Sequence, residues 1–206
     1  MAKRDTHAAD SASTPVSYAW TPDRLRHAIW LVLPPAPRQG PNLTAAASAT
    51  GVSARSLRRW LSGQATPTEE HAAALRAALL PDRTVLAQQQ DEHRWAEGAA
   101  RIISAPRGRG VDPVWRSRGW HKPHVLRVLT HQELGISRPA VALENRAKRF
   151  YPPQGWAIAS ERSFPNRPEA LLAKHNLLEE MAPHRVSVRA DLAPTGRHEC
   201  WLSDPQ

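Results

Sequence analysis

The same local pattern occurs twice along this chain of 206 residues, at Leu43–Gln64 and at Arg127–Arg146. In the first copy, Ala47 lies four residues before Gly51, and an apolar residue directly follows the glycine. Two short helices that cross at a steep angle approach closely only where the first offers a small side chain, and the sharp turn between them favours glycine because its φ is positive. Each copy therefore predicts a helix-turn-helix.

The second helix of the first copy is expected to begin after Ser53, whose hydroxyl can accept a hydrogen bond from an amide of the first turn. Val52, Leu57 and Trp60 would form its buried stripe. The segment resembles the DNA-binding domain of phage repressors and Cro-like regulators, whose second helix lies in the major groove. The resemblance implies that five residues contact DNA: Ser53, Ala54, Arg55, Arg58 and Arg59.

In the second copy, Gly135 precedes Ile136, and Val141 follows five residues later. Ser137 is expected to cap the second helix, and Pro139 would lie in its first turn, where a missing N–H costs little. This copy resembles the helix-turn-helix of winged-helix bacterial regulators. The resemblance implies base contacts from Ser137, Arg138 and Asn145 and phosphate contacts from Arg146, Lys148 and Arg149.

A basic segment at 105–113 connects the two halves of the chain. Its Pro-Arg-Gly-Arg core resembles an AT-hook, in which an extended arginine-glycine-arginine segment lies in the narrow minor groove of A·T-rich DNA. The resemblance implies that Arg107 and Arg109 form a minor-groove arm. An ordinary solvated linker is the alternative.

The formal net charge of +9 and a sequence pI near 10.9 predict attraction to polyanions, among which nucleic acid is the most abundant in a cytoplasm. No uninterrupted apolar run approaches the roughly 20 residues that span a bilayer, and the N-terminal residues lack the apolar core of a signal peptide. We therefore expect a cytoplasmic protein that binds double-stranded DNA and no membrane.

A single cysteine, Cys200, excludes an intramolecular disulfide and argues against a zinc site built from several thiolates. Phosphate-cradling, dinucleotide-binding, metalloprotease and serine-hydrolase motifs are absent from the sequence. His121, His124 and His131 are interpreted as ordinary polar or phosphate-contacting residues, and Tyr151 as a structural one. The sequence therefore predicts no enzyme, no cofactor and no bound metal.

The fold class expected is mainly α. Residues 1–18 are expected to form a disordered tail and 19–104 an N-terminal helix-turn-helix bundle that ends in a long helix. The basic linker at 105–113 would lead to 114–206, an α+β domain of helix-turn-helix or winged-helix type with a terminal β-hairpin.

Several local signals refine this expectation. Thr21 is predicted to cap the first helix, and Thr66 with Glu69 forms a capping-box signature for the fourth. Residues 81–104 would form one long helix, which is either a lid over the N-terminal core or a rigid spacer or dimer contact. Further along, we expect a short strand at 156–160, an amphipathic helix at 166–181 and a hairpin over 185–202.

Two helix-turn-helix modules in one chain suggest a transcriptional repressor of phage-immunity or plasmid type that reads an asymmetric site as a monomer, with a homodimer still open. The alternative is a replication, telomere or partition protein of a phage or linear replicon, a resemblance of size and composition. A third interpretation treats the second motif as fortuitous and the carboxy-terminal half as a partner-binding module.

Overall fold

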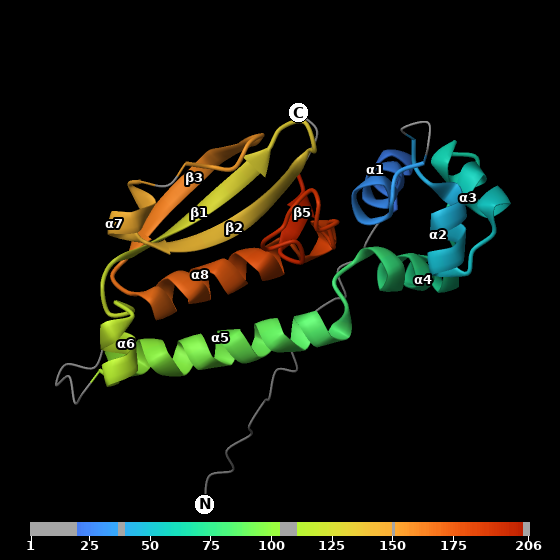
Figure 1. Ribbon diagram of the computed structural model, residues 1–206. Helices are drawn as coiled ribbons and strands as arrows, with labels where there is room; N and C mark the ends of the chain where they lie inside the picture. Colours follow the sequence, from blue (N-terminus) through green and yellow to red (C-terminus); the bar gives the residue numbers. More distant parts are fainter. Residues whose placement is uncertain (1–19, 37–39, 104–110, 150, 204–206) are drawn as a thin grey trace, which may run out of the picture.

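The computed structural model describes residues 20–36, 40–103, 111–149 and 151–203. The expected N-terminal tail and the AT-hook-like arm with Arg107 and Arg109 lie outside these residues. The described chain has two parts, a bundle of short helices and a layered α/β unit, which lie side by side in Figure 1.

The four helices expected in the N-terminal part are present. Their bounds are α1 Pro22–Val32, α2 Leu43–Thr50, α3 Ala54–Leu61 and α4 Glu69–Leu79. Thr21 caps α1 as predicted, since its hydroxyl accepts the amide of Arg24. Helix α4 is capped by Thr68 and not by Thr66, because the helix begins at Glu69 and only Thr68 reaches a first-turn amide.

A compact apolar core holds this bundle. Leu25 and Ile29 of α1, Leu57 of α3, and Leu75 and Leu79 of α4 are each at most 1 % exposed. Full burial of one such side chain stabilises the fold by about 1.5–3 kcal/mol. The bundle is therefore fixed by residues from three helices that meet at one centre.

The long helix α5, Arg83–Ile103, extends along α8, Arg167–Glu180, as Figure 1 shows. Its buried residues Ala96 and Ala99 give a narrow contact face. Two polar contacts reinforce the pair, because Glu92 of α5 accepts hydrogen bonds from Lys174 and His175 of α8. Lys174 also contacts Glu199, which directly precedes β5. The interpretation of this helix as a lid over the N-terminal core is wrong, since it packs mainly on α8.

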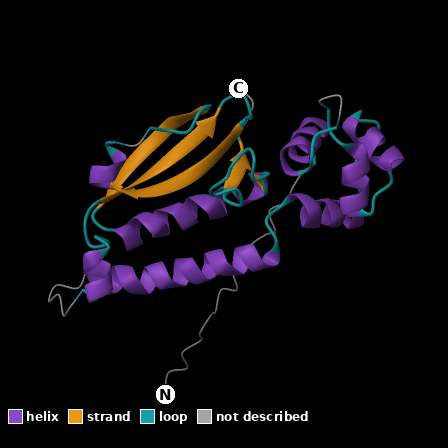
Figure 2. Cartoon of the chain, viewed as in Figure 1, coloured by secondary structure: helices purple, strands orange, loops and turns teal. Residues whose placement is uncertain are grey.

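A five-stranded antiparallel sheet forms the centre of the carboxy-terminal part, in the order β3-β1-β2-β5-β4 (Figure 2). The strands are β1 His124–His131, β2 Ile136–Leu143, β3 Trp156–Phe164, β4 Arg185–Val186 and β5 Cys200–Leu202. Short helical segments complete this part: α6 Pro113–Ser117, α7 Glu144–Ala147 and the 3-10 turn Ala182–His184. Helix α8 contacts β1, β2 and β3, and α5 lies on its outer side.

The second helix-turn-helix and the mainly α fold class are wrong. The segment Arg127–Arg146 falls largely on β1 and β2, which pair in register from His124 with Leu143 to His131 with Ile136. The glycine read as a helix-helix turn, Gly135, has a φ of 56° and ends the loop of this hairpin. The β-branched residues Val125, Val128 and Thr130 of β1 favour a strand, and pairing of β1 with β3 as well stabilises it further.

The terminal hairpin is present in a different role. The two ends of the predicted hairpin pair as antiparallel strands, Arg185 with Trp201 and Val186 with Cys200. Strand β5 also pairs with β2, so the hairpin extends the sheet and does not project as a wing. The predicted strand at 156–160 and helix at 166–181 correspond to β3 and α8.

The two parts share one apolar core. Ile136, Val186, Val188 and Leu202 of the sheet part belong to the same buried cluster as the core of α1–α4. Backbone hydrogen bonds also join the parts, from the amide of Ser187 to the Leu79 carbonyl at 3.1 Å and from Arg189 to Leu31 at 3.0 Å. The helical bundle is thus fixed on the end of the sheet that carries β4 and β5.

Candidate nucleic-acid interface

The segment α2-turn-α3 has the geometry that the first copy of the motif predicts. The carboxamide of Asn42 accepts the amide of Ala45 at the start of α2, and the Ser53 hydroxyl accepts the amide of Ser56 at the start of α3. Between the helices, Gly51 adopts a φ of 69°, and its amide donates to the Ala47 carbonyl. A side chain at this position would be strained, which explains the glycine.

The helices pack through the small and apolar residues of the motif. Val52, Leu57 and Trp60 are buried, with Leu57 fully enclosed. The small residue completely buried in α2 is Ala46, whereas Ala47 is partly buried against the same core. The ring of Trp60 meets His71 of α4 edge-on at 5.2 Å, so α3 is also fixed to the next helix.

The outward face of α3 is basic. Arg55, Arg58 and Arg59 are exposed, as is Ser53, and Ala54 is half-buried. Within the described part of the chain, none of the three guanidinium groups forms an ion pair or hydrogen bond. Their charge is therefore available to an external partner.

The dimensions of α3 suit a groove in a polyanion. An α-helix with its side chains is about 10–12 Å in diameter, which the B-DNA major groove of about 12 Å admits, and the eight residues of α3 extend roughly 12 Å along the helix axis. Its carboxy-terminal end is held by Arg26 of α1, which donates to the Leu61 carbonyl at 2.9 Å. This contact could not be predicted from local spacing, because Arg26 and Leu61 are far apart along the chain.

Two residues expected to contact DNA are structural in the sheet. Ser137 is buried on β2, and its hydroxyl lies 2.8 Å from the hydroxyls of both Thr130 and Ser203. Arg138 donates to the Thr195 carbonyl at 2.7 Å and stacks over Trp156 at 4.9 Å. Their predicted helix is strand β2, so they do not form a recognition surface.

The other four residues of that prediction remain exposed. Asn145 and Arg146 lie on α7, and Lys148 and Arg149 follow it directly. Helix α7 has only four residues and lies at the end of the sheet away from α3 in Figure 1. The structure does not bring this basic group together with the arginines of α3.

The structure also bears on metal binding, on the state of the Cys200 thiol and on membrane-spanning helices. The described residues include no group of three or more histidine, cysteine, aspartate or glutamate residues that could hold a metal ion. Cys200 is fully buried, and burial raises the pKa of its thiol to about 12. No helix in the described ranges combines the length and the apolar character that a membrane span requires.

No family model, curated protein or solved structure matches this chain. What the protein does is therefore inferred from its own residues.

Proposed function

We propose that this protein binds double-stranded DNA and places α3 in the major groove. The observation that carries the proposal is the exposed face of α3, where three arginines with no partner among the described residues lie on a helix held by its N-cap and by a buried core. An arginine fork matches the two acceptors of guanine, O6 and N7, and therefore supports recognition of particular bases.

Ser53, Ala54 and Arg55 belong to the first part of the helix, which enters deepest in this mode of binding. Arg58 and Arg59 follow one turn later on the same outward side. We assign Arg55, Arg58 and Arg59 to base edges or the adjacent phosphates. The rigidity of α3 lowers the conformational entropy lost on binding.

The described residues contain one helix-turn-helix, so each chain would read one half-site. We therefore propose that two copies of the chain bind a palindromic site. The asymmetric site expected from the sequence would require two such modules in one chain. The exposed residues Arg146, Lys148 and Arg149 are proposed as non-specific phosphate contacts for longer DNA.

Among DNA-binding proteins, we propose the role of a transcriptional repressor of phage or plasmid type, which acts by occupying its operator. The positive net charge supports rapid association with DNA in a bacterial cytoplasm. A protein that marks an origin, a telomere or a partition site would use the same surface.

Footprinting of the full-length protein on DNA that flanks its own gene tests this function. Protection of a short palindrome at a promoter would support operator binding by two copies. Protection confined to an origin or terminal repeat would favour the replication role. Equal affinity for all sequences, at several salt concentrations, would contradict sequence-specific recognition.

A further inference from the structure

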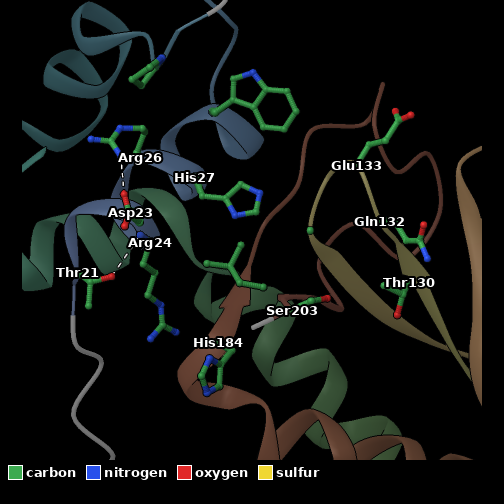
Figure 3. A pocket seen from close by; sticks show the side chains of 14 residues that line it. Thr21, Asp23, Arg24, Arg26, His27, Thr130, Gln132, Glu133, His184 and Ser203 are labelled. Atoms are coloured by element: carbon green, nitrogen blue, oxygen red, sulfur yellow. Dashed lines mark hydrogen bonds and ion pairs between the residues drawn. The ribbon is translucent and has the colours of Figure 1, made fainter. Parts of the chain in front are cut away.

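A cavity of about 1120 Å³ lies beside α1, where this helix meets the β1–β2 turn and the end of β5. Small-molecule sites usually occupy about 300–1,000 Å³, so its size would admit an organic ligand. Figure 3 shows side chains of both charges around it, the carboxylates of Asp23 and Glu133 and the guanidinium groups of Arg24 and Arg26. The lining thus favours neither an anion nor a cation, and the more specific surface lies on α5.

Helix α5 leaves an apolar surface exposed beside its contact with α8. Ala96 and Ala99 are buried in that contact. Trp95 is 37 % and Ile102 is 53 % exposed, and Gly98 is exposed as well. Residues three and four positions apart lie on the same side of a helix, so Trp95, Gly98 and Ile102 form one strip, which we call the Trp95 face.

Trp95 is held in its exposed position by other aromatic residues. Its ring meets Trp115 of α6 at 5.8 Å and Trp120 at 5.4 Å, both edge-on. Val114 of α6 adds further exposed apolar surface. A side chain that is already fixed loses little conformational entropy on binding. The Trp95 face is therefore preformed for contact with a partner.

Gly98 lies in the interior of α5, where glycine destabilises a helix relative to alanine. Its φ is not in the left-handed region, and a Cβ at this position would meet nothing within 4 Å. Neither the backbone conformation nor packing among the described residues therefore requires a glycine here. Glycine does allow another group to approach the backbone closely. A partner that packs directly on α5 would explain this residue.

We infer that the partner is a second copy of this chain, with the two α5 helices antiparallel and Trp95 of each copy packed over Gly98 of the other. The two positions are about one turn apart on the same face, so a twofold axis between them brings each onto the other. A bulky side chain thus meets a position without a side chain in both directions. Such a contact is self-complementary and closes as a dimer.

Charges at the two ends of the Trp95 face are complementary in the same arrangement. Asp91 lies one turn before Trp95, and Arg101 lies one turn after Gly98. In the antiparallel register, Arg101 of one copy comes level with Asp91 of the other, and the pair occurs twice by symmetry. Asp91 already pairs with Arg94 of its own chain, but its side chain is 68 % exposed and can accept a second cation.

The parallel arrangement lacks this complementarity. It would bring each residue level with its own counterpart, so that Asp91 would meet Asp91 and Trp95 would meet Trp95. Charged pairs at the rim of an interface contribute mainly to orientation and specificity. The charges of α5 therefore select the antiparallel dimer.

The dimer would supply the second helix-turn-helix that a palindromic site requires. The need for two copies rests on the proposed function, whereas the interface is argued from α5 alone. Its test needs no DNA. A chain that remains monomeric would overturn the interface and leave DNA binding untouched, and a dimer without sequence preference would contradict only the proposed function.

Sedimentation equilibrium of the full-length protein tests the interface. We expect a dimer whose dissociation constant rises by at least about tenfold in Gly98→Leu, because the added side chain occupies the place of Trp95 from the other copy. Leucine is a better helix former than glycine, so α5 should stay folded in this variant, which far-UV circular dichroism verifies.

Trp95→Ala and Leu86→Ala form a matched pair. Both remove an apolar side chain of α5, 37 % and 38 % exposed, but Leu86 lies about two and a half turns before Trp95 and so on the opposite side of the helix. We expect weaker self-association in Trp95→Ala alone. A wild type that sediments as a monomer up to millimolar concentration would overturn the interface, as would a dimer that neither Gly98→Leu nor Trp95→Ala weakens.

Charge reversal tests the orientation. Asp91→Arg and Arg101→Asp should each weaken self-association, because each brings like charges level in the two copies. A mixture of the two single variants should form a heterodimer, since the reversed charges then face each other and the unchanged pair is kept. A mixture that associates no better than either variant alone would overturn the antiparallel arrangement.

Discussion

Arg189 of the sheet part donates from Nη1 to the carbonyl oxygens of Trp30, at 2.6 Å, and Leu33, at 2.8 Å. These carbonyls lie at the carboxy-terminal end of α1, where helices leave such groups without partners. Asp191 holds the same guanidinium at 3.1 Å. One side chain from the sheet part therefore caps a helix of the DNA-binding bundle and fixes the two together.

Substitution Arg189→Ala should reduce the free energy of unfolding by about 2 kcal/mol, because two carbonyls of a partly buried helix end lose a charged donor. Urea denaturation followed by tryptophan fluorescence measures this effect. Arg94→Ala is a suitable control, since Arg94 lies exposed on α5 and forms an ion pair with the exposed Asp91 one turn away. A loss equal to that of the control would show that the cap contributes little.

Substitution Arg58→Ala should weaken binding to the cognate site by about 1–3 kcal/mol and relax the preference at one base pair. Fluorescence anisotropy with the cognate site and with single-base variants measures both effects. Arg149→Ala should instead weaken binding to all DNA sequences equally and reduce the dependence of the affinity on salt concentration. The reason is that a phosphate contact carries no sequence information. Identical, sequence-independent losses for the two variants would contradict the assignment of Arg58 to a base.

Stability should decrease as the pH falls through about 6.5, and His27 should contribute to that decrease. Burial lowers the pKa of His27 in the folded protein, so the unfolded chain binds more protons in this range and acid favours unfolding. His124 and His198 have pKa values lowered by the same cause and act in the same direction. Thermal unfolding at pH 7.5 and 5.5 measures the combined effect.

The variant His27→Gln isolates one part of that pH dependence. Its amide can still donate toward the Leu134 carbonyl but does not titrate. The difference in Tm between the two pH values should therefore be smaller than in the wild type. An unchanged difference would show that His27 does not contribute.

A second loss of stability is expected at lower pH, from Glu92 on α5. The hydrogen bond from His175, together with Lys174, lowers the pKa of this carboxyl group from 4.5 to about 2. The folded state thus favours the ionised form, and its contribution is present above pH 4.5 and is lost as the pH falls toward 2. Acid titration by circular dichroism should show a shallower transition in Glu92→Gln, and a transition of the same steepness would argue against this role.

Local signals in the sequence were sufficient to predict helices α1, α3 and α8. Thr21 and Ser53 cap the helices that they were expected to cap, and the buried stripe of Val52, Leu57 and Trp60 is the predicted one. These features depend on hydrogen bonds and packing between residues close in the chain, which spacing alone reveals. The exposed arginines of α3 were identified for the same reason.

The same kind of spacing led to a wrong prediction at Gly135. A glycine with positive φ followed by apolar residues fits a helix-helix turn and a hairpin loop equally well. The outcome depended on partners elsewhere in the chain, since β1 pairs with β3 and β2 with β5. Strands β1 and β2 are each paired along both edges, and short-range patterns do not contain that information.

Local spacing was enough to predict the first helix-turn-helix, its Ser53 cap and its basic face, because each depends on neighbours within a few residues. The sheet, the packing of α5 on α8 and the cavity beside α1 depend on contacts between distant parts of the chain. These arise from contacts such as Arg189 with Trp30 and Arg26 with Leu61, which join residues far apart in the chain. Long-range packing selected one arrangement among several that the local pattern allowed.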